Sequence, residues 1–278
     1  TRRNTHDRFL FRCRPGRYRI DDGPSRRPRP KQRAVISMMP AMSVIQIWRF
    51  PVKSLGGEQL EGVDVTELGI AGDRAWGILD HETDTVLTAR REPRLLMASA
   101  RLSDDGHPIV TLPDGTETDS SETISAWLGR DVALTRAADH IGVFENPKDF
   151  EHETDWVSWQ GPAGAWHDAE WARVSLVSAS SLRDLDPRRF RTNLVIGAGD
   201  ENMLIGMSVA LGTCRLDVLR GINRCIMVAR SQPGLVADLD ILRTIHRESN
   251  GRLAVGATVS QEGRVRVGDP LRTNTQGA

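Results

Sequence analysis

The sequence predicts a mostly β protein with a few helices, barrel-like rather than built on a doubly wound sheet. From Ser43 onward, short apolar or alternating runs are separated by Gly, Asp and Pro, which is typical of short strands joined by turns. Helical spacing is confined to a few segments, the clearest being 120–129 and 238–250. No glycine-rich phosphate loop follows a strand and opens a helix, so the sequence does not indicate a nucleotide-binding α/β sheet.

In the first half, the pattern predicts strands over 44–50 and 60–66, then two hairpins. The first hairpin pairs 76–79 with 85–88, and the second pairs 101–103 with 109–112 around Asp104-Asp105-Gly106. A helix follows, with Ser120 or Ser121 as its N-cap and Gly129 at its end. The stretch 136–165 is polar but carries Trp156 and Trp159, so we expect a connecting loop that is a candidate cover for a site.

In the second half, the pattern predicts strands over 173–177, 194–196, 209–211 and 214–219. A short helix through Leu182 ends before Pro187. A longer helix over 238–250 places Leu239, Leu242 and Ile245 on one face and closes at Asn250-Gly251. The last strands expected, 257–260 and 264–267, form a terminal hairpin around the turn at 261–263.

Length and composition limit the class of protein. The 278 residues suffice for one large domain or two smaller ones, and no run approaches the eighteen or so apolar residues of a membrane-spanning helix. Cys13, Cys214 and Cys225 are too widely spaced for a disulfide framework or a CxxC zinc site. These features indicate a reducing, cytoplasmic setting.

Charge is distributed unevenly along the chain. Residues 1–38 hold eleven Arg and one Lys against three Asp, whereas the remainder carries 25 basic and 34 acidic side chains. The mildly acidic remainder argues against nucleic acid as the main partner. We expect 1–38 to be a disordered basic extension. A polyanion-binding arm, a transit-like peptide and a translated upstream extension all remain open as its origin.

Cys225 is the most informative candidate for chemistry. It lies in Gly221-Ile-Asn-Arg-Cys225, beside a polar and basic sequence, where a lone thiol can be a soft metal ligand or a nucleophile. The alternative is a buried structural cysteine, which is the usual role of a free thiol. Cys214 lies in an alternating run and is expected in the core.

Several further segments carry a resemblance to a known family. Together they span roughly residues 43–272, and their order and spacing match: Phe50-Pro-Val-Lys53-Ser54, Gly69-Ile-Ala-Gly-Asp73-Arg74-Ala-Trp76, Leu87-Thr-Ala-Arg90-Arg-Glu-Pro93-Arg94-Leu95, Phe190-Arg191-Thr-Asn193-Leu-Val-Ile196, Asn223-Arg224-Cys225 and Val267-Gly-Asp-Pro270. The chain resembles MOSC-domain proteins with an N-terminal MOSC β-barrel domain, and among them the molybdenum enzymes typified by the mitochondrial amidoxime-reducing component.

The resemblance implies an architecture and an activity. It implies an N-terminal MOSC β-barrel domain over 43–135 packed against a C-terminal MOSC β-barrel domain over 166–274. It further implies a molybdenum cofactor held by Cys225, and reduction of small N-hydroxylated substrates such as hydroxylamines and amidoximes. Electrons would come from a separate electron-transfer protein. The alternative function is a sulfur-carrier module with a persulfide on Cys225 and no molybdenum, and an inactive relative that keeps the fold is a third possibility.

Seven residues match family positions around the pterin cofactor and its phosphate: Lys53, Ser54, Arg74, Ser178, Ser181, Arg191 and Asn193. Arginine can bind a phosphate with two parallel hydrogen bonds, and lysine acts as a point charge. Surface ion pairing, turn formation or helix capping are the alternative roles. Thr192 and Val228-Ala229-Arg230 depart from the family pattern, which often has Pro at the first position and Thr-rich sequence at the second.

Overall fold

The computed structural model describes residues 42–149 and 154–273. Strands dominate, and three α-helices occur in these residues, so the predicted fold class is confirmed. The predicted extension 1–38 lies outside the described residues. None of the helices in the described ranges combines the length and the apolar character that crossing a membrane requires.

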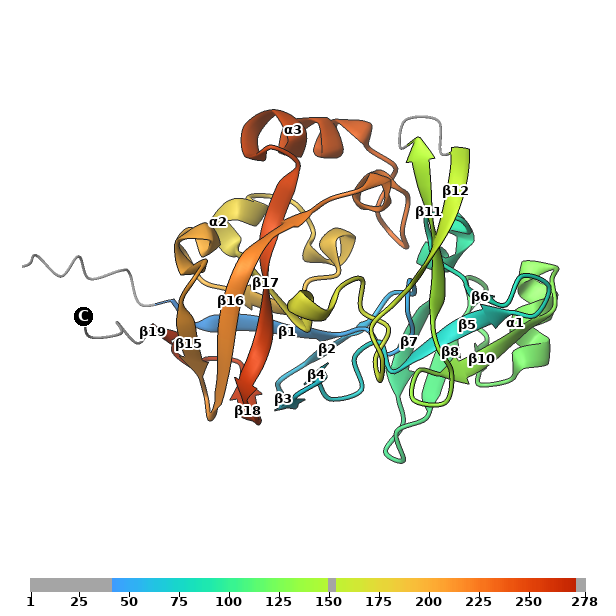
Figure 1. The fold of residues 1–278 in the computed structure, drawn as a ribbon, viewed down its shortest axis with the longest axis horizontal. Helices are drawn as coiled ribbons and strands as arrows, with labels where there is room; N and C mark the ends of the chain where they lie inside the picture. The colour runs from blue at the N-terminus through green and yellow to red at the C-terminus, as the bar shows by residue number, and fades with distance from the viewer. Residues whose placement is uncertain (1–41, 150–153, 274–278) are drawn as a thin grey trace, which may run out of the picture. The chain divides into compact units, whose positions relative to one another are not determined.

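The largest element is an eight-stranded sheet in the order β19-β15-β16-β17-β13-β14-β1-β2 (Figure 1). Its strands are β1 (Val44–Arg49), β2 (Glu58–Leu60), β13 (Val174–Ser178), β14 (Leu194–Ile196), β15 (Ser208–Leu211), β16 (Cys214–Asn223), β17 (Arg252–Gln261) and β19 (Arg272–Thr273). Only β13 and β14 pair in parallel, and their connection carries the helix α2 (Ala179–Leu182). Parallel neighbours need such a crossover because a tight turn cannot join them.

The first strands of the chain belong to the sheets of its second half. β1 pairs with β14, and β3 (Gly62–Thr66) pairs with β18 (Gly263–Arg266) and with β4 (Gly69–Ile70). Their alternating residues Val44, Ile47, Val63 and Val65 are buried in one cluster with apolar residues of β13 to β17. We expected β18 to form a terminal hairpin with β17, and this was wrong: β18 turns away to pair with β3, which buries Val265.

A second hydrophobic cluster organises residues 76–136. Its buried residues include members of β5 (Trp76–Asp80), β7 (Ser99–Leu102), β8 (Pro108–Thr111), β10 (Val132–Arg136) and the helix α1 (Ser121–Leu128). The strands β6 (Thr85–Val86) and β9 (Glu117–Thr118) pair with β5 and β8. The predicted hairpins β5–β6 and β7–β8 are confirmed. So are the ends of α1, because the Ser120 hydroxyl accepts from the Thr123 amide at 3.2 Å and Gly129 closes the helix at φ 62°.

Two sequence-based expectations need correction, one about the loop 136–165 and one about the buried face of the last helix. Within the expected loop 136–165, β11 (Val143–Asp149) and β12 (Thr154–Gln160) form an antiparallel hairpin, visible in Figure 1. Phe144 is buried against Trp159 in a small cluster that also contains Leu79, Val86 and Trp166. The ring of Trp156 instead lies under the Arg91 guanidinium. The helix α3 (Leu239–Ser249) forms where expected, but Ile241 and Ile245 are its buried residues, and Leu239 is exposed.

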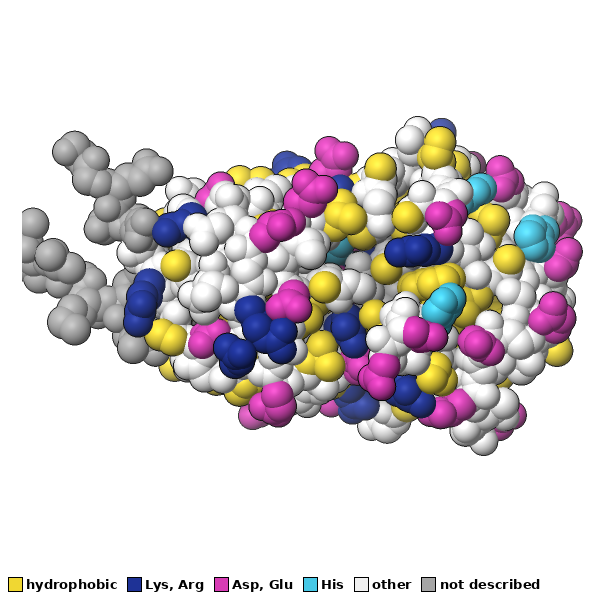
Figure 2. All heavy atoms as spheres, turned by 90° about the horizontal axis from the view of Figure 1, so that it is seen from below, with side chains coloured by type: hydrophobic (Ala, Val, Ile, Leu, Met, Phe, Trp, Pro, Cys, Tyr) yellow, Lys and Arg dark blue, Asp and Glu magenta, His cyan; other side chains and the backbone are white. Residues whose placement is uncertain are grey.

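Short 3-10 helices connect several strands: η1 (Pro93–Met97), η2 (Glu170–Ala172), η3 (Pro187–Phe190), η4 (Glu201–Leu204) and η5 (Ile226–Ala229). Three of them, η2, η3 and η5, adjoin residues of the pocket described below. On the face of the molecule shown in Figure 2, acidic and basic side chains are interspersed.

Candidate functional site

One pocket collects most of the residues that the sequence singled out. It encloses about 860 Å³ of space between protein atoms, part of which is open solvent. Three parts of the chain line it: 53–90 from the first half, 167–193 from the start of the second, and 222–228 around the cysteine. Of the sequence-predicted site residues, it includes Lys53, Ser54, Arg74, Arg191, Asn193 and Cys225.

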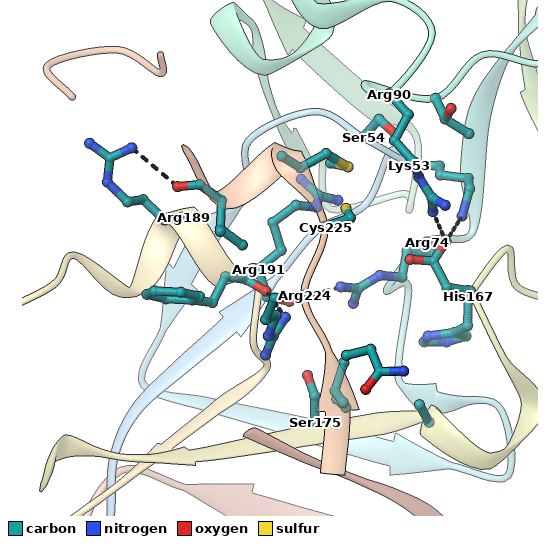
Figure 3. A pocket seen from close by; sticks show the side chains of 18 of the residues that line it. Lys53, Ser54, Arg74, Arg90, His167, Ser175, Arg189, Arg191, Arg224 and Cys225 are labelled. Carbon is teal, nitrogen blue, oxygen red and sulfur yellow. Dashed lines mark hydrogen bonds and ion pairs between the residues drawn. The ribbon is translucent and has the colours of Figure 1, made fainter. Parts of the chain in front are cut away.

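Cys225 lies where β16 gives way to η5, with its thiol on the wall of the pocket (Figure 3). It is half-buried and free, and its side chain does not cap η5. Cys214 is the other cysteine in the described part of the chain. It is buried in the core, as expected, and burial raises the pKa of its thiol to about 11. Among the described residues, therefore, Cys225 is the only thiol that faces the pocket.

The segment that follows Cys225 is held from two sides. The buried Arg189 guanidinium donates to the carbonyls of Val228 at 3.3 Å, Arg230 at 3.2 Å and Val236 at 2.7 Å. Arg230 in turn donates to the carbonyls of Ala89 and Arg90 in the first half of the chain. These contacts fix the peptide that carries the thiol, as a site with a defined ligand geometry requires.

Arg224 is held rigidly by neutral acceptors. It donates to the carbonyls of Leu253 at 2.7 Å and Phe190 at 2.9 Å and to the Thr192 hydroxyl at 3.3 Å. Burial lowers its pKa to about 10, and a guanidinium remains protonated at neutral pH. Its positive charge therefore lies next to Cys225, and no carboxylate of the described residues bonds it.

Arg191 carries a second uncompensated charge. It ends η3 in the left-handed region at φ 50°, and its guanidinium lies 4.5 Å from the centre of the Phe50 ring. Its Nη1 is buried without a hydrogen-bond partner. Burial, followed by the charge of Arg74, lowers its pKa to about 9. An unpartnered guanidinium nitrogen in a pocket is a donor available to a ligand.

Arg74 and Asn193 meet at the buried carboxylate of Asp73. This carboxylate accepts from the Phe50 amide at 2.7 Å and from Asn193 Nδ2 at 3.0 Å, and it forms an ion pair with Arg74. The Asn193 amide is fully used, because its oxygen also accepts from the amide and hydroxyl of Ser175 and its nitrogen donates to the Trp48 carbonyl. These bonds fix the Asn193 side chain, which thereby stabilises the wall of the pocket.

Lys53 and Arg90 share one carboxylate, that of Asp168. Lys53 Nζ donates to Asp168 Oδ1 at 2.8 Å and to the Trp166 carbonyl at 2.9 Å, and Arg90 Nη2 lies 3.6 Å from the same Oδ1. Burial lowers the pKa of Lys53 to about 8, although Asp168 opposes the shift. The surrounding protein disfavours a charge on Asp168, but Lys53 and Arg90 outweigh this and hold its pKa well below the usual range.

The three serines occupy two different places. Ser54 lines the pocket, and its hydroxyl accepts from the Ala89 amide at 3.0 Å. Ser178 and Ser181 do not line it. Ser178 caps α2, and Ser181 donates to the buried carboxylate of Glu201 at 2.6 Å. The structure therefore gives Ser178 the capping role that the sequence left open, and it gives the Ser181 hydroxyl a hydrogen bond to Glu201.

Sequence reasoning missed His167 and Asp168, which line the pocket just after the buried Trp166. Their signal was weak: two polar residues that follow an aromatic residue at the end of an expected loop. The His167 ring lies 3.1 Å from the Leu68 carbonyl, and burial together with the Arg74 charge lowers its pKa to about 3, so it is neutral at pH 7. The described residues contain no group of three or more His, Cys, Asp or Glu side chains arranged to hold a metal.

Comparison with known families matches both halves of the chain. The MOSC N-terminal beta barrel domain matches residues 41–157, and the MOSC domain matches residues 164–272. Mitochondrial amidoxime-reducing component 1 of Mus musculus is 34% identical over 84 residues, 29% of this chain and 24% of that protein. Molybdenum cofactor sulfurase of Drosophila ananassae is 23% identical over 270 residues, 87% of this chain and 34% of that protein. The chain thus spans about a quarter to a third of the length of these curated relatives.

Solved structures give a weaker likeness. The YUAD protein from Bacillus subtilis has a TM-score of 0.42 at 12% identity, over 84% of this chain and 94% of that one. YiiM from Geobacillus stearothermophilus has a TM-score of 0.33 at 19% identity, over 49% of this chain and 74% of that one. TM-scores this low do not support an argument from structural likeness.

Proposed function

Because the chain belongs to the family that joins a MOSC N-terminal β-barrel domain to a MOSC domain, we propose that its pocket binds a molybdenum cofactor and that the protein reduces N-hydroxylated compounds to amines. The observation that carries the proposal is that, among the described residues, one thiol and two guanidinium groups without a carboxylate partner line the same pocket. Cys225, Arg191 and Arg224 all line one pocket, and Arg191 Nη1 is a buried donor without an acceptor.

The residues present fit such a cofactor. A pterin cofactor brings its own sulfur ligands and a phosphate, so the protein needs one soft ligand and fixed positive charge rather than a cage of side chains. The pocket offers Cys225 as that ligand and Arg191 and Arg224 as the charge, while the described residues offer no cluster of three metal-binding side chains.

Each residue has a definable task in this proposal. Cys225 would supply the thiolate, on a peptide held by Arg189 and Arg230. Arg191 would donate to the cofactor phosphate, and Arg224 would add positive charge beside the thiolate. Asp73 and Asn193 keep Arg74 and the 190–193 turn in place before any ligand arrives, which reduces the cost of ordering the site on binding.

The reaction itself would be R–NHOH + 2e⁻ + 2H⁺ → R–NH₂ + H₂O. When bound, the molybdenum cofactor supplies the two-electron chemistry that breaks the N–O bond. The sequence contains no flavin, haem or iron–sulfur motif, so we propose that a separate reduced redox protein carrying one of these groups delivers the electrons.

The test is an anaerobic assay on the full chain, made in cells that synthesise the cofactor, with reduced methyl viologen as donor and benzamidoxime as substrate. We expect benzamidine formation by the wild type, none by Cys225→Ala, and near-normal rates for Cys214→Ala, which removes the core thiol instead. Equal activity in the wild type and in Cys225→Ala would overturn the proposal.

A second function has support from the match that covers 87% of this chain, to a protein named molybdenum cofactor sulfurase. In this alternative Cys225 carries a persulfide and no molybdenum. Cyanide-releasable sulfur that disappears in Cys225→Ala, together with molybdenum-free wild-type protein from the same cells, would favour the sulfur carrier over the reductase.

A further inference from the structure

Thr88 has a hydroxyl group that the protein itself leaves unused. The residue lines the pocket and is only 3% exposed, and its Oγ1 has no hydrogen-bond partner among the described residues. A hydroxyl can donate one hydrogen bond and accept two, and burying it without a partner costs free energy. A ligand in the pocket beside Thr88 would supply the missing partner.

A second unused donor comes from the same segment of the chain. Arg90 also lines the pocket, and its Nε is buried without a hydrogen-bond partner among the described residues. The other end of this guanidinium is occupied, because Asn146 accepts from Nη1 and Asp168 Oδ1 lies 3.6 Å from Nη2. Two residues that are two positions apart thus each bring an unused N–H or O–H donor to the pocket lining.

The backbone between the two donors is held in place. The Ala89 amide donates to Ser54 Oγ at 3.0 Å, and the carbonyls of Ala89 and Arg90 accept from Arg230. These contacts fix the peptide before any ligand arrives, which lowers the cost of ordering the donors on binding.

This segment also lies beside the peptide that follows Cys225. Met227, two residues after Cys225, packs against the hydrophobic cluster that contains Leu87 and Ala89, the two neighbours of Thr88. The hydrogen bonds from Arg230 to the Ala89 and Arg90 carbonyls join the same two segments. A group bound by Thr88 and Arg90 is therefore held next to the segment that begins at Cys225.

The two donors suit an uncharged oxygen better than a phosphate. Arg90 already faces the carboxylate of Asp168, whereas Arg191 and Arg224 have no carboxylate partner among the described residues. A phosphate gains more at Arg191 and Arg224, because a cation without a counter-ion binds an anion more strongly. The pocket thus has one region suited to an anion and a second suited to a neutral polar oxygen.

We propose that Thr88 donates its hydroxyl hydrogen to the oxygen of the substrate N–O group, with Arg90 Nε as the second donor to the same oxygen. Thr88 is then a substrate-binding residue that holds the oxygen to be removed. For an amidoxime the balanced reaction is R–C(NH₂)=NOH + 2e⁻ + 2H⁺ → R–C(NH₂)=NH + H₂O, with electrons from the reduced redox protein, and the oxygen held by Thr88 leaves in the water. The contact involves the N–O group alone, so hydroxylamines, amidoximes and N-oxides share it. This inference rests on the proposed function.

The first test measures binding without turnover, because no electron donor is present. Pyridine N-oxide is titrated calorimetrically into the full chain purified from cofactor-producing cells, with pyridine, which lacks the oxygen, as the matched ligand. We expect Thr88→Val, which keeps the shape and removes the hydroxyl, to weaken pyridine N-oxide binding roughly three- to tenfold and to leave pyridine binding unchanged. Thr88→Ser keeps a hydroxyl and should bind pyridine N-oxide nearly as the wild type does. Unchanged affinity for pyridine N-oxide in Thr88→Val would overturn the proposal.

Thr85→Val is the matched control. Thr85 is also buried, and its hydroxyl is hydrogen-bonded to that of Thr83 at 2.8 Å, but it does not line the pocket. The control variant should bind both ligands as the wild type does. If it weakened pyridine N-oxide binding as much as Thr88→Val, the effect would come from the packing of this region and the proposed contact would be wrong.

The second test follows turnover with reduced methyl viologen as donor. Thr88→Val should lower kcat/KM for benzamidoxime and for pyridine N-oxide by similar factors, because both present an N–O oxygen, and Thr88→Ser should recover most of the loss. Molybdenum content is measured in the same samples. Molybdenum-free wild type that still binds pyridine N-oxide through Thr88 would reject the reductase and keep the contact, while normal molybdenum with no effect of Thr88→Val would reject only the contact.

Discussion

The cations from the two halves of the chain are compensated differently. Those from the first half have carboxylate partners: Lys53 and Arg90 approach Asp168, and Arg74 pairs with Asp73. Those from the second half, Arg189, Arg191 and Arg224, are held by backbone carbonyls, a hydroxyl or an aromatic ring. Paired charges mainly fix the geometry of a site, whereas charges without counter-ions remain available to an anionic ligand.

The largest expected effect concerns the paired half. Asp73→Ala leaves the Phe50 amide, the Asn193 amide and the Arg74 guanidinium without their shared buried acceptor. We expect a loss of about 3–5 kcal/mol in the free energy of unfolding, measured by urea denaturation. Asp64→Ala, which breaks an exposed pair with Arg264, should cost less than about 1 kcal/mol. If both variants lost a similar free energy of unfolding, the buried Asp73 carboxylate would not be important for stability.

Arg191 tests the unpaired half. Arg191→Met keeps the apolar stem against Phe50 and removes the uncompensated charge. In protein made without the cofactor, we expect the affinity for inorganic phosphate to fall roughly 10- to 100-fold, the worth of a charge-assisted hydrogen bond. Stability should be unchanged or higher, because a buried charge without a counter-ion is removed.

Arg74→Met is the matched comparison for Arg191→Met. It leaves the buried Asp73 carboxylate without its cation, so we expect a marked loss of stability. If Arg74→Met instead kept its stability and Arg191→Met lost it, the distinction between paired and unpaired cations would be wrong.

Lys53 gives a pH dependence of smaller size. Its pKa falls from 10.5 to about 8 on folding, so between these values the unfolded chain binds more protons and stability rises with pH. The burial cost is fully present below pH 8 and is relieved above it. Between pH 7 and 9 we expect a gain of about 1 kcal/mol relative to Lys53→Met.

The contribution of Lys53 is the difference between the stability profiles of the wild type and Lys53→Met. The raised pKa of Cys214, about 11, acts in the opposite direction: the unfolded thiol ionises first, so stability falls between pH 9 and 11. Both proteins retain Cys214, so the difference between them cancels its effect. Parallel profiles for the wild type and Lys53→Met would contradict the assignment to Lys53.

The smallest effect is expected at Thr192. Thr192→Val removes one 3.3 Å hydrogen bond to Arg224, which keeps its two carbonyl acceptors, and should cost less than about 1 kcal/mol in unfolding experiments. Thr192→Ser should retain the bond. A loss above about 2 kcal/mol in Thr192→Val would mean that this hydroxyl, and not the carbonyls, holds Arg224 in place.

Local patterns predicted much of the fold, and they failed where pairing is long-range. Ser120 and Gly129 fix the ends of α1 through contacts within a few residues, so sequence alone sufficed. The partner of β18 is β3, some two hundred residues away, and no local signal distinguishes it from the adjacent β17. The aromatic residues of 143–160 indicated packing, but their polar neighbours hid the hairpin.

The sequence likewise predicted one aspect of the candidate site, its membership, but not its hydrogen bonds. The motifs singled out Lys53, Arg74, Arg191 and Cys225, which are far apart in the sequence and line one pocket in the structure. Motifs do not specify which side chain bonds which. The Asn193 side chain is hydrogen-bonded to Ser175 and Asp73, and Ser178 and Ser181 both donate to Glu201. Asp168 lines the pocket although it belongs to none of the motifs recognised in the sequence.

The most direct measurement is the molybdenum and pterin content of the full chain purified from cofactor-producing cells. We predict near-stoichiometric amounts of both in the wild type and in Cys214→Ala, and loss of molybdenum in Cys225→Ala. Wild-type protein without molybdenum from those cells, or a Cys225→Ala variant that retains it fully, would contradict the account of this pocket.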